Sequence, residues 1–182
     1  MRNSIALALA AIVLAQGPAR AANWPAPQPP ALAHAPGYVD IPDVAVKRDP
    51  RRTYKAIFNA VAGPKDHAKQ LAALERVGLQ INGLMLAHVP ADHIRFVMIL
   101  HGPSVEALYT DAEYRAKFGT PNPNLPLVEE LLEAGVQIFV CGQYMAKSDT
   151  PRSALITQAQ VAEAATLVMI TYADDGYALI DE

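Results

Sequence analysis

The sequence predicts an α/β domain with three layers, in which helices cover both faces of a central, mainly parallel sheet of about five strands. Apolar, strand-like segments alternate with segments of helical period from residue 53 onward, and Gly and Pro residues separate them. The run IRFVMIL at 94–100 is almost continuously apolar, which is typical of a parallel strand buried on both faces. The chain of 182 residues accommodates one such domain with additional segments.

Residues 1–21 have the pattern of a bacterial export signal. Arg2 is followed by an uncharged apolar run at 5–15, and Ala19 and Ala21 form a small-residue cleavage site. As a helix, that run is about 16 Å long, which is too short for a hydrocarbon core of about 30 Å. We therefore expect a cleaved signal peptide, a periplasmic mature protein and no membrane attachment afterwards. The alternative is a short anchor that is never cleaved.

Residues 22–50 form a proline-rich arm. Its seven prolines exclude a helix or a central strand, so an extended arm is expected. Packing on the domain, packing on a neighbouring subunit and a mobile linker are the three alternatives, with Trp24 and Tyr38 as candidate anchors. The remaining residues, 51–182, form the α/β domain.

The first half of this domain contains two predicted strands and one long helix. The segment 53–61 is apolar and rich in β-branched and aromatic residues, and Gly63 and Pro64 end it. Apolar residues recur at three- and four-residue steps over 65–87, which predicts a helix that ends before Pro90. The second strand is the run at 94–100.

The second half repeats the alternation with shorter elements. Helical turns are expected from Ser104 to Phe118, and the two prolines around Asn122 require a loop. Pro126 suits a first helical turn, and Gly135 ends that helix. The remaining elements are a strand at 136–141, a helix or loop at 143–147, a strand at 158–163, a helix at 166–174 and a short edge strand at 177–180.

Charge and motifs exclude several classes of function. The net charge is −3, and it becomes −5 when Arg2 and Arg20 leave with the signal, so no general affinity for nucleic acid is expected. The single cysteine excludes an internal disulfide and a cysteine-rich zinc site. No dinucleotide fingerprint, P-loop or nucleophile elbow is present. We predict no cofactor and no metal.

Three side chains with useful chemistry fall at predicted strand ends. His101 and Cys141 end or follow their strands, and Asn59 lies near the end of the first. In parallel sheets, ligands bind beyond the carboxyl ends of the strands. These residues are therefore candidates for a common site.

Cys141 is followed by Gly142 and Gln143 at a predicted helix start. Backbone N–H groups at a helix N-terminus favour a nucleophilic thiolate, and glycine permits close approach of a ligand to the backbone. The alternative is a buried, inert cysteine, because free cysteines are among the most buried residues. His101 either assists the sulfur chemistry as a proton donor or is satisfied by backbone alone.

The chain resembles the DsrE/DsrF-like sulfur-relay family. The matching stretches are FVMILHGPSVEAL at 96–108, NPNLPLVEELLEAGVQIFVCGQYM at 122–145 and DGYALI at 175–180. The resemblance implies a parallel α/β fold, an assembly of several subunits and a cysteine that accepts sulfur as a persulfide. Cys141 matches that cysteine, and His101, Asn124, Gly142 and Gln143 match other positions of the family pattern. The export signal and the arm depart from the cytoplasmic relay members.

Two functions are consistent with these features. The first is an exported sulfur-handling protein, a sulfurtransferase or carrier, in which Cys141 exchanges sulfane sulfur with a donor or acceptor protein. His101 would tune or protonate the sulfur. The binding residues would be Asn59, Asn124, Gly142 and Gln143. The second is a non-catalytic oligomeric module that binds a small ligand or a partner. For both we expect a homo-oligomer, a trimer or hexamer, to whose contacts residues 22–50 contribute without building the fold; light scattering with and without the arm tests this.

Overall fold

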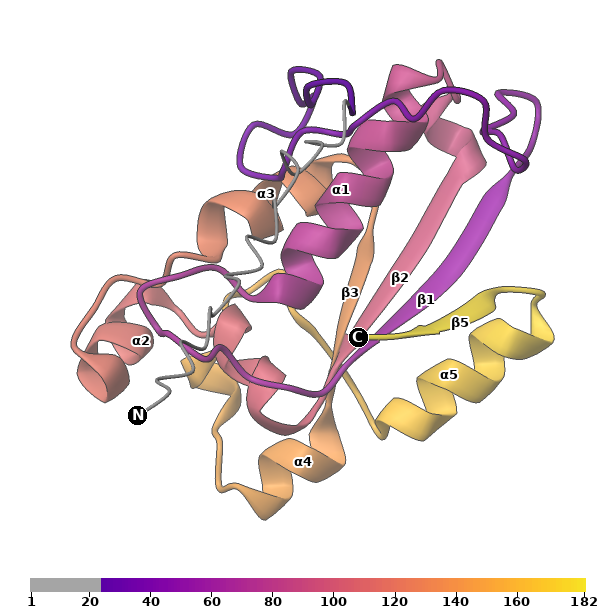
Figure 1. Cartoon of the computed structure of the whole chain (residues 1–182). Helices are drawn as coiled ribbons and strands as arrows, with labels where there is room; N and C mark the ends of the chain where they lie inside the picture. The colour runs from indigo at the N-terminus through magenta and orange to yellow at the C-terminus, as the bar shows by residue number, and fades with distance from the viewer. Residues whose placement is uncertain (1–23) are drawn as a thin grey trace, which may run out of the picture.

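Five parallel strands form the centre of the protein in a computed structural model that describes residues 24–182. Their order across the sheet is β4-β3-β2-β1-β5, and every neighbouring pair is parallel. This confirms the predicted fold class, and Figure 1 shows the twisted sheet. The strands are β1 (Tyr54–Ala60), β2 (Ile94–Leu100), β3 (Gln137–Cys141), β4 (Gln160–Ala162) and β5 (Ala178–Asp181).

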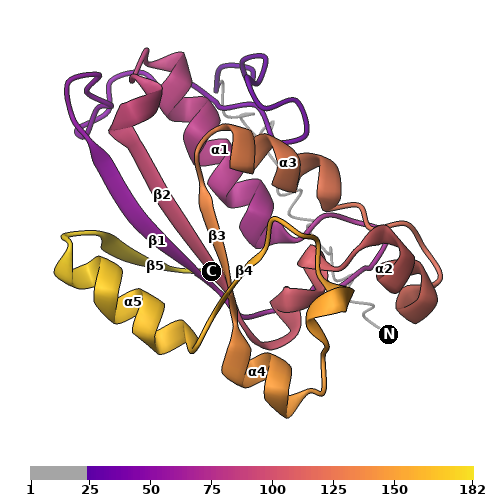
Figure 2. The same ribbon diagram turned by 180° about the vertical axis from the view of Figure 1, so that it is seen from behind.

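Helices cover the two faces of this sheet unequally. Figures 1 and 2 show α1 and α3 side by side on one face and α5 on the other. The helices of the described residues are α1 (Ala72–Leu86), α2 (Asp111–Phe118), α3 (Leu125–Glu133), α4 (Gly142–Lys147) and α5 (Ala165–Asp174), and 3-10 turns span η1 (Ala91–His93), η2 (Gly102–Leu108) and η3 (Arg152–Ala154).

The strand alternation sorts the core into two clusters. On the α1 face, Phe58 and Phe96 pack edge to face with ring centroids 5.0 Å apart. On the α5 face, Ile57, Val97 and Val168 form a smaller cluster. The central strand β2 is buried on both faces except at Arg95, which explains its continuous apolar run.

The long helix is shorter than the sequence predicts. Helix α1 begins at Ala72, whereas helical spacing pointed to a start near residue 65. The backbone N–H of Leu71 donates to the Asn124 side chain at 2.7 Å, and Asp66 caps a turn through the N–H of Ala68. These side-chain acceptors hold residues 65–71 as a loop, because they satisfy backbone donors outside a helix.

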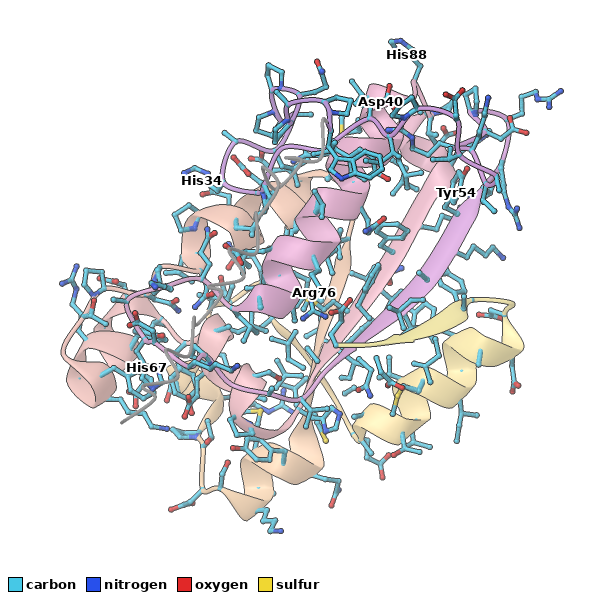
Figure 3. The ribbon with its side chains drawn as sticks, in the orientation of Figure 1. His34, Asp40, Tyr54, His67, Arg76 and His88 are labelled. Atoms are coloured by element: carbon cyan, nitrogen blue, oxygen red, sulfur yellow. The ribbon has the colours of Figure 1, made fainter. Side chains whose placement is uncertain are left out.

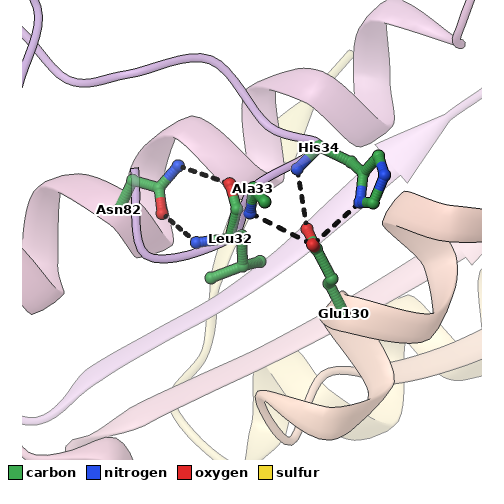
Figure 4. Close-up of polar contacts among 5 residues, drawn as sticks. All are labelled: Leu32, Ala33, His34, Asn82 and Glu130. Carbon is green, nitrogen blue, oxygen red and sulfur yellow. Dashed lines mark hydrogen bonds and ion pairs between the residues drawn. The ribbon is translucent and has the colours of Figure 1, made fainter. Parts of the chain in front are cut away.

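The arm is attached to its own domain through hydrogen bonds to α1 and α3 and through a buried leucine. Asn82 of α1 accepts a hydrogen bond from the N–H of Leu32 at 2.8 Å and donates to the carbonyl of Pro36 at 3.0 Å. On α3, the Glu130 carboxylate accepts the N–H groups of Ala33 and His34 (Figure 4). Leu32 belongs to the main hydrophobic core.

The expectation that residues 22–50 do not build the fold is therefore wrong for residues 32–38. Ala35 is also a core residue and lies directly against Gly78 of α1. The proline pattern correctly excluded a helix, but it could not reveal that α1 presents glycine at the positions where the arm crosses it.

The predicted signal peptide lies in residues 1–23, outside the described part of the chain. Among residues 24–182, no helix is long and apolar enough to span a membrane.

Candidate functional site

One face of the sheet carries Asn59, His101 and Cys141 at the carboxyl ends of its strands, which we call the carboxyl edge. Ile57 of β1 and Ile99 of β2 lie in the α5-face cluster, so residues two positions further along each strand point to that same face. Cys141 is itself a member of that cluster. Since β1, β2 and β3 are neighbours, the structure brings these three predicted residues together.

The sulfur of Cys141 lies under the start of helix α5. Its Sγ accepts a hydrogen bond from the backbone N–H of Ala165, the first residue of α5, at 3.3 Å. The residue is 7% exposed. The sequence correctly suggested a helix N-terminus near this thiol, but the donor comes from α5 and not from the helix that follows Cys141 in the chain.

A chain of hydrogen bonds orients the His101 ring. Asn59 Nδ2 donates to the Asp181 carboxylate at 2.9 Å, so the Asn59 carbonyl oxygen faces His101 Nε2 at 2.8 Å. A carboxylate only accepts hydrogen bonds, which fixes the Asn59 amide orientation and requires His101 to donate from Nε2. In a neutral His101, Nδ1 is then the free acceptor. No hydrogen bond joins His101 to Cys141.

Partial burial lowers the pKa of His101 from its ordinary value, because burial disfavours the charged imidazolium. The ring is therefore neutral near pH 7, with its proton on Nε2. This protonation state makes Nδ1 a base that can receive a proton from a nearby acid.

Replacing His101 by glutamine should flatten part of the pH dependence of stability. In the wild type, the unfolded state takes up the His101 proton at about pH 6.5, before the folded state does. The contribution of His101 to the free energy of unfolding is therefore complete above about pH 6.5 and decreases as the pH drops toward the lowered pKa of the folded state. Urea unfolding of both proteins between pH 5 and 8 measures this difference. Parallel stability profiles would contradict it.

Gly142 and Gln143 connect β3 to the segment before α5. A Cβ on Gly142 would lie 2.8 Å from the Ala162 carbonyl oxygen, so this position requires glycine. The N–H of Gln143 donates to the carbonyl of Glu163 at 3.1 Å, while its side chain is exposed. Both residues thus hold the strand end that carries Cys141.

Asn124 is fully buried and makes no hydrogen bond to Asn59, His101 or Cys141. Its side-chain oxygen Oδ1 accepts a hydrogen bond from the Leu71 N–H, and its side-chain nitrogen Nδ2 donates to Asn122 Oδ1 at 2.9 Å. Asn122 in turn donates to the carbonyls of Ala107 and Tyr109. The structure gives Asn124 a role in joining the start of α1 to the loop before α3.

Sequence reasoning missed Asp181 and the backbone of Ala165. Asp181 occupies the register position opposite Asn59 on β5, so a correct pairing of the edge strand with β1 would have found it. Ala165 contributes only a main-chain N–H, for which the residue type carries no signal. Among residues 24–182, no group of three or more His, Cys, Asp or Glu side chains is arranged to hold a metal ion.

Comparisons with known proteins support the fold. The chain matches no protein-family model and no curated protein sequence. Among solved structures, it is similar to the YchN protein from E. coli, with a TM-score of 0.51 and 15% identity over 71% of this chain and 99% of that one. It also matches a protein of unknown function, MTH1491 from Methanobacterium thermoautotrophicum, with a TM-score of 0.49, 19% identity and the same coverages.

The protein therefore has a parallel α/β fold of the DsrE-like type. At this level of identity the likeness describes the fold alone, and the chemistry rests on the residues at the carboxyl edge of the sheet.

Proposed function

We propose that this chain is an exported sulfur-handling protein in which Cys141 accepts and passes on sulfane sulfur as a persulfide. One observation carries the proposal: the only thiol of the chain lies at the carboxyl edge of the sheet, with a backbone N–H donating to its sulfur. An N–H donor at a helix start stabilises negative charge on sulfur. Such charge is required both for the attack and for the terminal sulfur of a persulfide.

The transfer step exchanges one sulfur–sulfur bond for another. The Cys141 thiolate attacks the terminal sulfane sulfur of a donor, and a new S–S bond forms at Sγ. The donor's own S–S bond breaks, and its leaving group keeps the electron pair. Attack by an acceptor thiolate on the outer sulfur reverses the process and restores Cys141, so no net oxidant is needed.

His101 suits the role of a proton acceptor for this thiol. Its Nε2–H is committed to Asn59, and its Nδ1 is the free acceptor on the same face of the sheet as Cys141. Asp181 supports the arrangement through Asn59. Removal of the thiol proton by His101 would create the nucleophile, and return of that proton would follow release of sulfur.

Incubation with inorganic polysulfide, followed by intact-mass measurement, tests the proposal. We expect a species about 32 Da heavier, the mass of one sulfur atom, that disappears on reduction. The Cys141→Ser variant should show none, and because the chain has no other cysteine this variant is a complete control. His101→Gln should slow the formation of the adduct without abolishing it. A wild-type protein that gains no sulfur would overturn the proposal.

Burial of Cys141 favours a second candidate, a non-catalytic binding module. Because Cys141 is only 7% exposed, its thiol is reached only by small reagents unless the start of α5 moves. Labelling with a small alkylating reagent in native buffer and in denaturant separates the two functions. Slow labelling in native buffer with rapid labelling in denaturant favours the binding module, and rapid labelling in native buffer favours sulfur transfer.

A further inference from the structure

A large cavity lies on the opposite face of the sheet from Cys141. It has a volume of about 660 Å³, within the range of small-molecule sites. Helix α1 forms one wall, strands β1 and β5 form the floor, and the arm closes one end through Tyr38 and Arg48. A ligand there would not touch the cysteine site, because the sheet separates them.

The cavity exists because no helix covers β5 on this face. Figures 1 and 3 show α1 on this face of the sheet with no helix over β5, Arg76 projecting from α1 on this side and Tyr54 at the start of β1. Ala178 and Ile180 of β5 line the cavity and are exposed to solvent. The floor is apolar, since Phe58 and Phe96 continue it beneath α1.

Positive charge gathers around this apolar floor. The lining residues include four cations and one carboxylate, although the whole chain has a net charge of −3. The cations are Arg48, Arg52, Lys55 and Arg76, and the carboxylate is Glu182.

Two of the four cations have no carboxylate partner. Arg48 pairs with Asp40 and Arg76 pairs with Glu182. Lys55 donates to the backbone carbonyl of Asp175 at 3.0 Å, and its ammonium lies over the Tyr177 ring on the α5 face, so its charge is directed away from the cavity. Within residues 24–182, the Arg52 guanidinium has no hydrogen-bond or ion-pair partner, whereas its neighbour Arg51 is paired with Asp49.

From this arrangement we propose that the cavity is a binding site for a small organic anion with an apolar body. The apolar part lies on Ala178, Ile180 and the aromatic floor, where it covers apolar surface that is otherwise exposed to solvent. The anionic group meets the Arg52 guanidinium at the rim, because a guanidinium binds carboxylate or sulfonate oxygens with two parallel hydrogen bonds.

The arm is part of this site. The Tyr38 ring lies directly on α1 at Gly83, where a Cβ would approach its ring carbons to 2.5 Å, and Arg48 lies over the same ring at 4.7 Å from its centroid. Arg48 also donates to the Gly83 carbonyl at 2.7 Å. The packing of the arm thus gives the cavity its end wall.

A pair of fluorescent dyes tests the proposal on the mature protein. The probes are 8-anilinonaphthalene-1-sulfonate, an apolar body with a sulfonate, and N-phenyl-1-naphthylamine, the same body without it. We expect one saturable sulfonate site that binds at least about tenfold more tightly than the neutral dye. Arg52→Gln should weaken sulfonate binding by about tenfold, and the matched control Arg51→Gln should leave it unchanged.

A second pair of variants tests the location. Ala178→Phe places a ring in the cavity on an exposed edge strand and should abolish sulfonate binding, whereas Leu179→Phe on the opposite face should not. Circular dichroism checks that both variants fold. Equal affinity for the two dyes, equal effects of the two arginine variants, or equal effects of the two phenylalanine variants would each overturn the proposal. Sulfur transfer at Cys141 is unaffected in every outcome, so the two proposals fail separately.

Discussion

Replacing Asn124 by alanine is expected to lower the free energy of unfolding by about 3 kcal/mol. The substitution leaves the buried N–H of Leu71 without an acceptor and removes one of the two donors to Asn122 Oδ1, the other being the backbone N–H of Asn124. A buried polar group without a partner costs about 1–3 kcal/mol, which applies to the Leu71 N–H, and the lost hydrogen bond to Asn122 adds about 1 kcal/mol. Chemical denaturation of the two proteins at pH 7.5 measures the difference.

Asn59→Ala is the matched control for this prediction. Asn59 is half-buried at the carboxyl edge, and its two partners, His101 and Asp181, remain accessible to water. The same chemical change should therefore cost about 1 kcal/mol or less there. Asn59→Ala should alter the rate of sulfur uptake, and Asn124→Ala should not. The reverse pattern would mean that Asn124 belongs to the site and not to the scaffold.

Most of the fold could be predicted because periodicity reports burial. Strand β2 is continuously apolar since both faces are covered, and α3 shows its buried stripe at Leu127, Val128 and Leu131. The start of α1 could not be predicted, because it depends on an acceptor at Asn124 that is 53 positions away from Leu71 in the chain. Helical spacing is a local signal and contains no information about such a partner.

The candidate site was predictable to the same extent. Strand ends give the positions of Asn59, His101 and Cys141, because parallel strands bring their carboxyl ends to one edge. The donor to the sulfur is a main-chain N–H of Ala165, and the orientation of His101 depends on Asp181 through the register of an edge strand. These contributions arise from tertiary packing, so the residue types alone do not predict them.

The arm shows how a glycine on one element can encode the position of another. Gly78 and Gly83 stand in the interior of α1, where glycine costs about 1 kcal/mol relative to alanine. A Cβ at Gly78 would lie 2.4 Å from the Cβ of Ala35, and one at Gly83 would meet the ring of Tyr38. The helix gives up intrinsic stability at these two points and gains the contact with the arm.

Exchanging the two small residues at this crossing should therefore give a large energetic coupling. Gly78→Ala alone gains about 1 kcal/mol of helix propensity but overlaps the methyl group of Ala35, so we expect a net loss of about 1–2 kcal/mol. Ala35→Gly alone removes a buried methyl group and loosens the arm, at a cost of about 1 kcal/mol. In the double variant the two Cβ positions no longer compete. Its stability should exceed the sum of the single effects by at least about 1 kcal/mol in a double-mutant cycle measured by urea unfolding.

The matched control pairs Gly78→Ala with Ala33→Gly. Ala33 lies on the same arm two positions before Ala35, but its side chain is exposed, and its Cβ does not limit the space at Gly78. The control cycle should be additive within about 0.5 kcal/mol. Because Tyr38 follows Ala35 on the arm, the same single variant Gly78→Ala should also weaken sulfonate-dye binding, and Ala35→Gly should restore it. A Gly78→Ala variant that is more stable than the wild type would show that Ala35 does not pack closely against Gly78. The contact between these two residues would then contribute nothing to the stability of the fold.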